Sequence, residues 1–245
     1  MVKPLTTPST GIEELVDANS GTDIVATPVV MNRFENLKKR YEQYLMVKDG
    51  VELWVKNYVK EIVLPCDINL FLQQTREYED HPNYQRYTGL FISQLMRKSY
   101  TAGNSEFKLD VNLLKPIDSL VSHVSGTKER MVMVIIKGKV RDFCGWNTQH
   151  STFIVEEAGA DYGFEAQHSV LTIEKAEDMC GFHTEHSTLT IENAADRCGW
   201  ASRHSTFNTH NPEQYEKFKE FVDPNKGNTL YLLATSGSIL QGGPW

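Results

Sequence analysis

Hydrophobic and polar positions recur with a period of 18 residues in the second half of the chain. The repeat runs without a gap through four units, which are residues 142–159, 160–177, 178–195 and 196–213. Its clearest columns are Gly145, Gly163, Gly181 and Gly199; Trp146, Phe164, Phe182 and Trp200; and His150, His168, His186 and His204. Agreement in this many columns indicates that each unit forms the same structural element.

Within each unit, the residues that follow the histidine alternate between apolar and polar and are rich in β-branched side chains, as in residues 150–156. This pattern is typical of a β-strand. Helical hairpin repeats need units of about 33 residues or more. We therefore predict a parallel β-solenoid with one coil per repeat and rungs ~4.8 Å apart. The six-residue aliphatic spacing of left-handed hexapeptide solenoids is missing, so we expect a right-handed coil.

The alternation predicts which side chains face inward. Ser151, Phe153 and Val155 should point to the interior, because the Phe and Val columns are apolar in nearly every unit. Cys144 and Trp146 flank Gly145, and we expect both columns to lie in the interior as well. The column of Cys144, Cys180 and Cys198 should then consist of buried thiols.

Further elements are predicted on both sides of the repeat. The apolar run at 130–136 should form one more strand, and residues 229–234 another. Asn211 and Pro212 have the pattern of a helix start, so a helix over 212–222 should cap the last coil. Upstream, apolar spacing predicts helices over 32–45, 51–63, 67–78, 83–100 and 115–124.

These elements predict an α+β fold, in which a mainly helical N-terminal domain precedes a parallel β-solenoid with a C-terminal capping helix. The predicted divisions are a loose leader at 1–30, the helical domain at 31–125, the solenoid at 126–235 and a tail at 236–245. The leader is expected to be loose because it is rich in Thr, Ser, Pro and Gly.

Composition and charge narrow the function classes. The chain has 245 residues, of which 40% are hydrophobic and 23% charged, so a packed core is expected. No apolar run approaches the ~18 residues of a membrane span, and the N-terminus lacks the pattern of a secretory signal. We therefore expect a cytoplasmic protein that makes no membrane contact.

Charge is divided unevenly along the chain. Residues 142–210 hold 3 basic and 11 acidic residues, whereas residues 1–141 hold 19 basic and 17 acidic residues. The acidic repeat should therefore repel nucleic acid.

The repeated chemistry favours a binding face over a catalytic site, because a catalytic centre needs one special coil whereas these side chains recur in every coil. We predict a non-catalytic interaction or scaffold protein that binds a protein partner or itself, without a cofactor or metal. The predicted binding face consists of His150, Thr152, Glu156, His168, Thr172, Glu174, His186, Thr188, Thr190, Glu192 and His204.

Two alternatives stay open. One is an RNA- or ribosome-associated factor that binds through basic residues of the helical domain, namely Arg33, Lys38, Lys39, Arg40, Arg97 and Lys98. The other is a metal-binding or carbohydrate-active β-helix enzyme. It would use the histidine column as metal ligands, or the column of Glu156, Glu174 and Glu192 as paired carboxylates.

Overall fold

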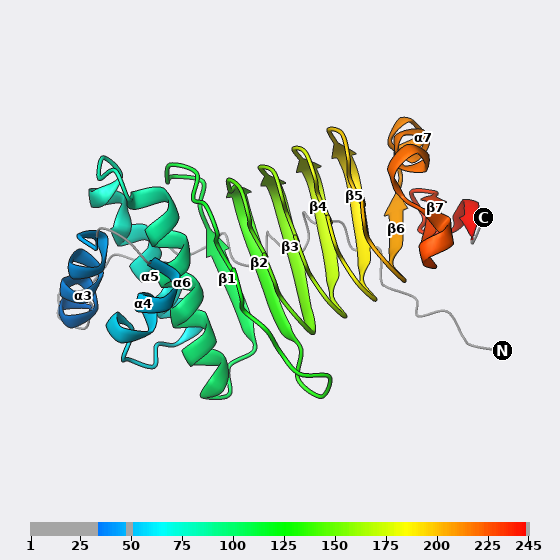
Figure 1. Ribbon diagram of the computed structural model, residues 1–245. Coiled ribbons are helices and arrows are strands. Elements are labelled where there is room, and N and C mark those ends of the chain that lie inside the picture. The colour runs from blue at the N-terminus through cyan, green and yellow to red at the C-terminus, as the bar shows by residue number, and fades with distance from the viewer. Residues whose placement is uncertain (1–33, 48–50, 244–245) are drawn as a thin grey trace.

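The computed structural model describes residues 34–47 and 51–243, and it arranges them along one axis (Figure 1). Helices stand at one end, the stacked strands follow in sequence order, and a C-terminal helix stands at the other end. The predicted helical region, parallel solenoid and C-terminal helix are confirmed. The predicted leader lies outside the described residues.

The N-terminal helices are α3 (Glu35–Leu45), α4 (Val51–Tyr58), α5 (Pro65–Gln74) and α6 (Tyr84–Thr101), with the 3-10 helix η1 (Thr75–Tyr78). They pack around buried aromatic rings. The ring centroid of Phe91 lies 5.2 Å from the ring centroid of Tyr41, and 5.8 Å from those of Tyr44 and Phe71. The helix predicted from residue 67 begins at Pro65, which suits the first helical position because it has no N–H to leave unpaired.

One eight-stranded sheet runs the length of the solenoid. Its strands are β1 (Glu106–Asp110), β2 (Val132–Lys139), β3 (Ser151–Ala158), β4 (Val170–Ala176), β5 (Thr188–Ala194), β6 (Thr206–Thr209), β7 (Thr229–Leu233) and β8 (Ile239–Gly243). They pair in sequence order. Strands β1 to β7 are parallel, and β8 pairs antiparallel with β7. Across β3 to β5 the register shifts by one 18-residue unit per strand, as in Thr152 with Val170 and Val170 with Thr188. The segment expected to be a tail therefore contains a paired strand.

A tight turn returns the chain to the start of the next strand. Gly181 stands in this turn at a φ of +67°, and a Cβ there would lie 2.3 Å from Cδ2 of Leu189. Only glycine avoids both the left-handed strain and this overlap. The glycine column is thus explained by the geometry of one repeated turn.

The solenoid begins earlier than residue 126. The peptide N–H of Ser119 donates to Asp142 O, just as Phe143 N donates to Ala160 O one coil later. Ser119, Val121 and His123 have φ of +57°, +65° and +58°, which excludes an α-helix. The helix predicted over 115–124 is therefore wrong. Leu120 and Val124 are both buried in this turn, and their spacing of four residues resembles that of a helix face.

The interior contains the predicted strand columns. Phe153, Leu171, Leu189 and Phe207 are fully buried, and Val155 and Cys144 are buried with them. The aromatic column after the glycine was expected inside, and this is wrong: Trp200 is 49% exposed, and Trp146, Phe164 and Phe182 are half-buried. The left-handed glycine reverses the chain, so the residues on its two sides do not share a face as they would in a strand.

Both ends of the solenoid interior are covered. At the first end, α5 meets β1, where Asn69 Oδ1 accepts from Asp110 N at 2.9 Å and Gln73 Nε2 donates to Asp110 O at 2.5 Å. At the other end, α7 (Pro212–Phe221) follows its predicted cap Asn211, whose side chain accepts from the N–H groups of Glu213 and Gln214. The ring of Phe218 on α7 lies 5.9 Å from the ring of Phe207, so the helix covers the last coil.

Candidate interaction surface

A buried serine ladder holds the start of each strand in place. Ser151 N donates to Ser169 Oγ at 3.3 Å, Ser169 N to Ser187 Oγ at 3.2 Å, and Ser187 N to Ser205 Oγ at 3.3 Å. Each hydroxyl also donates to the carbonyl two residues before it, at 2.8–2.9 Å. Because these bonds repeat from coil to coil, the side chains on either side of the serines are kept in register.

The histidines directly before the serines form an outer ladder of parallel imidazoles. His150, His168, His186 and His204 have φ between +48° and +50°. Consecutive rings lie 5.1 Å apart between centroids, and their planes differ by 8°, 1° and 9°. Gly227 continues the column, because a Cβ there would lie 2.5 Å from Nδ1 of His204.

The spacing of this histidine ladder bears on metal binding. Equivalent nitrogens of parallel rings lie about as far apart as the ring centroids, which are 5.1 Å apart. Two Zn–N bonds of ~2.1 Å span at most ~4.2 Å. Neighbouring rings therefore cannot share a metal ion while they remain stacked. Within the described residues, no three His, Cys, Asp or Glu side chains are grouped so as to hold a metal.

Next to the histidine ladder lies what we call the outer sheet face, formed by two rows of outward residues on β2 to β6. Its members are Met133, Ile135, Thr152, Ile154, Val170, Thr172, Thr188, Thr190, Thr206 and Asn208. None of them is charged. They are half-buried or exposed, and Met133 and Val170 reach 41% and 38% exposure. The sheet thus presents two continuous uncharged rows across five strands.

The glutamates near the ends of these strands differ in their contacts. Glu156 Oε2 accepts from Gly138 N at 2.7 Å, and Glu192 contacts Nδ1 of His210 at 2.5 Å. Glu174 between them is exposed. Two of the three carboxylates in the predicted column are therefore engaged by neighbouring coils. The column forms a charged border of the outer sheet face.

Sequence reasoning missed a second surface feature, which we call the aromatic ladder. It consists of His123, Trp146, Phe164, Phe182, His183 and Trp200. The ring centroid of Phe182 lies 5.2 Å from that of Phe164 and 5.3 Å from that of Trp200. Trp146 Nε1 donates to Glu165 at 3.3 Å. The Trp-Phe-Phe-Trp column was visible in the sequence, but its outward orientation depends on the turn.

Carboxylates pair with two of the basic residues proposed for RNA. Lys38 pairs with Glu77 at 2.7 Å and Arg40 with Glu61 at 3.0 Å. Lys39 is exposed on α3, whereas Arg97 and Lys98 lie near the end of α6 and contact Gln94 Oε1 and the Lys60 carbonyl. Arg33 lies outside the described residues. Pairing with carboxylates reduces the positive potential that a phosphate backbone would meet.

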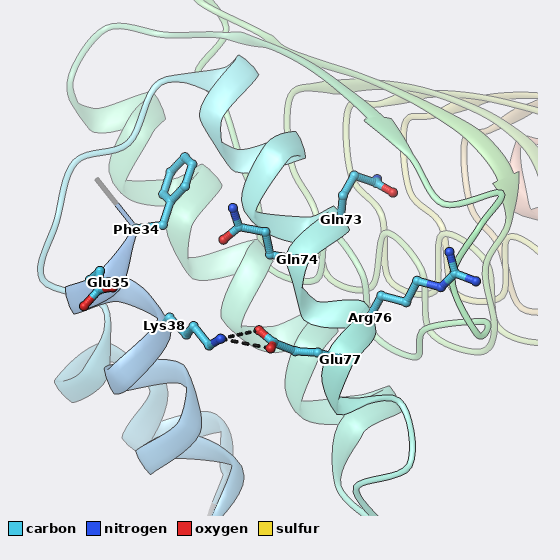
Figure 2. Close-up of a pocket in the computed structure, with 7 residues that line it drawn as sticks. All are labelled: Phe34, Glu35, Lys38, Gln73, Gln74, Arg76 and Glu77. Atoms are coloured by element: carbon cyan, nitrogen blue, oxygen red, sulfur yellow. Dashed lines mark hydrogen bonds and ion pairs between the residues drawn. The ribbon is translucent and has the colours of Figure 1, made fainter. Parts of the chain in front are cut away.

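A groove of about 560 Å³ lies between α3 and the α5–η1 segment (Figure 2). The Lys38–Glu77 ion pair crosses it, and Glu35 and Arg76 add one further charge of each sign. This balance of charges gives the groove no preference for a cation or an anion.

The cysteines are free thiols, and three are buried in the solenoid as predicted. Burial raises the pKa of Cys144 to about 12, so its thiol is protonated at neutral pH. A hydrogen bond with Cys198, together with burial, raises the pKa of Cys180. These side chains act as small core residues, not as nucleophiles.

Comparison with protein-family models, curated proteins and solved structures finds no match to this chain. In the part of the chain that the structure describes, no helix has the length and apolar character needed to cross a membrane.

Proposed function

We propose that this protein is a non-catalytic interaction protein that binds a protein partner through the outer sheet face. The observation that carries the proposal is the pair of uncharged rows across β2 to β6, which lie between the histidine ladder and the glutamate column. Protein interfaces have this anatomy, with charged residues depleted in the centre and present at the rim.

The rigidity of the face supports the same proposal. The serine ladder and the parallel register hold the threonine and valine side chains in fixed rows. Threonine and valine also have few rotamers to lose. A surface that is already ordered loses little conformational entropy on binding, so more of the contact energy remains as affinity.

The free cysteines bear on where the protein would work. Cys180 and Cys198 lie in adjacent coils, within hydrogen-bonding reach, and neither is part of a disulfide. Thiols at such a distance persist in reducing compartments. We therefore include a cytoplasmic location in the proposal.

The experiment is affinity capture from a lysate of the source cells, with three baits: the wild type, Thr172→Lys and Ala195→Lys. Thr172 lies in the middle of the outer sheet face, whereas Ala195 is exposed after the end of β5. The two variants add the same charge. We expect a partner that Ala195→Lys retains and Thr172→Lys loses by at least tenfold, while both variants keep the wild-type melting temperature.

Captures are repeated with nuclease and at raised salt. A partner that survives both treatments supports a protein contact, because nucleic-acid binding falls steeply with salt. Capture that both treatments abolish would favour the RNA-associated alternative. Equal capture by the two variants would contradict the proposed face.

A further inference from the structure

A small pocket lies where the start of α7 meets the ends of β4 and β5, and its volume is about 190 Å³. Pockets for organic ligands commonly have volumes of ~300–1,000 Å³, whereas one water takes ~30 Å³ of the liquid. The pocket therefore has the size for a small ion. Its charged and amide side chains are Lys175, Asn193, Asn211, Glu213, Gln214 and Lys217.

Gln214 brings a buried amide to this pocket. The residue is 3% exposed, and its Oε1 accepts from Ala194 N at 2.9 Å, which fixes the orientation of the amide. Its Nε2 is buried and has no hydrogen-bond partner in the described part of the chain. A buried donor without a partner costs free energy. The site therefore becomes more stable when an oxygen atom of a ligand accepts from Nε2.

The other amide at the start of α7 is already engaged within the chain. The side chain of Asn211 accepts from the N–H groups of Glu213 and Gln214. Its Nδ2 donates to Glu192 O at 3.2 Å and to Asn193 Oδ1 at 3.0 Å. The unpartnered donor of Gln214 is thus separate from the capped helix start.

The charges that line the pocket favour an anion. Two lysines stand against one glutamate, and Lys217 Nζ lies 3.8 Å from Glu213 Oε1. Lys175 forms no ion pair with any described residue. Glu157, the register partner of Lys175 on β3, is engaged by Lys139 at 2.6 Å. Lys175 is therefore a cation with no counterion beside a buried donor.

We propose that this pocket binds a phosphate-type oxyanion, which accepts from Gln214 Nε2 and pairs with Lys175 and Lys217. Phosphate presents four oxygens and can therefore meet three donors at once, and hydrogen bonds to a charged oxygen are stronger than neutral ones. Lys175 and Lys217 are exposed and have flexible stems, so they can move to admit the ion to the buried Nε2. None of these residues belongs to the outer sheet face, so the inference goes beyond the proposed function.

The test titrates the full chain with inorganic phosphate in a low-salt buffer and follows the backbone amide resonances of α7 and of the ends of β4 and β5 by NMR. The matched variants are Lys175→Gln and Lys128→Gln. Lys128 is exposed in the loop before β2, so Lys128→Gln removes the same charge away from the pocket. We expect Lys128→Gln to keep the wild-type affinity within twofold. Lys175→Gln should bind phosphate at least fivefold more weakly.

Gln214→Glu tests the buried donor. This variant keeps an oxygen for Ala194 N and replaces the unpartnered Nε2 by a second oxygen, so phosphate binding should be lost. Because a buried carboxylate can hinder folding, circular dichroism accompanies each titration, and Lys217→Gln provides a second, exposed change at the same pocket. We expect Lys217→Gln also to weaken binding at least fivefold.

Acetate provides the control for charge attraction alone, because it has two oxygens and cannot meet all three donors. We expect acetate to bind at least fivefold more weakly than phosphate. Equal affinity for the two anions would overturn the proposal. So would a wild type without saturable shifts at millimolar phosphate, or saturable shifts that Lys175→Gln leaves unchanged. Thr172→Lys should bind phosphate as the wild type does, which keeps this result independent of the partner proposed for the outer sheet face.

Discussion

At the scale of the residue, the turn decides what each repeated side chain does. Gly181 takes a φ of +67°, and its neighbours Cys180 and Phe182 consequently lie in different places, one in the core and one half-exposed. Phe153 is fully buried on β3, so the chain contains phenylalanines in two environments. Truncation to alanine should therefore lower the free energy of unfolding by different amounts at Phe182 and Phe153.

We expect Phe182→Ala to lower the free energy of unfolding by about 1–2 kcal/mol, because it loses ring stacking and part of its buried area. Phe153→Ala should cost about 3–5 kcal/mol, since it leaves a cavity in a packed interior. Urea unfolding followed by circular dichroism measures both values. Equal losses would show that the aromatic ladder is as buried as the core.

Asp161 is a repeat residue whose negative charge the fold disfavours. Burial raises its pKa, and the nearby Asp142 and Asp178 raise it further. Its Oδ1 is buried and has no hydrogen-bond partner among the described residues. A carboxyl whose pKa is raised by folding favours the folded state when protonated, and this contribution is lost as pH rises through the folded pKa.

We therefore expect Asp161→Asn to stabilise the protein at pH 7, where the wild-type carboxyl is charged. The gain should shrink as pH falls, because the wild-type carboxyl becomes neutral in both states. Asparagine also tolerates the φ of +58° at this position. The exposed Asp196→Asn serves as a control for net charge. Thermal melts from pH 4 to pH 7 measure the difference, and a gain that grows in acid would contradict this account.

At the scale of the element, a residue other than serine makes the last contact of the serine ladder. Asn228 takes the place of the ladder serine after β6, and its Oδ1 accepts from Ser205 N at 3.0 Å. Its Nδ2 donates to the carbonyls of Ser202 at 3.0 Å and Asp223 at 2.9 Å. One buried amide thus closes the serine ladder and ties the last coil to the segment that follows α7.

Asn228→Ala should lower the free energy of unfolding by about 2–4 kcal/mol, because it leaves buried backbone groups without partners. Asn225→Ala, three residues away, removes an exposed side chain and should change stability by no more than about 0.5 kcal/mol. Denaturant titration of the two variants gives the comparison. A loss of less than 1 kcal/mol for Asn228→Ala would mean that water replaces the amide at this end.

At the scale of the whole molecule, the helices and the solenoid share one continuous core. The buried apolar cluster extends from Phe34 through Phe107 on β1 to Leu232 on β7. The helical part thus closes one edge of the sheet and one end of the interior. The interaction proposed for the outer sheet face also belongs to this scale, because that face depends on strands β2 to β6 being in register.

The sequence alone determined the features that depend on periodicity and local chemistry. The 18-residue period predicted the parallel strands and the stacked histidines, and Asn211 followed by Pro212 predicted α7. Such features follow from repetition, because identical units must pack in the same way against one another. The outward alternation of the strand residues could also be deduced from the strand period alone.

Only the tertiary structure decided the features that depend on where the chain turns and what covers it. The coil at 118–126 has lost the glycine and the His-Ser pair, so only its hydrogen bonds to the next coil identify it. The aromatic ladder faces outward because of a backbone angle in the turn, which composition does not reveal. Strand β8 ends the sheet because it folds back on β7, and α5 contacts β1 at the opposite edge. These outcomes rest on contacts between distant segments, and a local sequence pattern carries no information about such contacts.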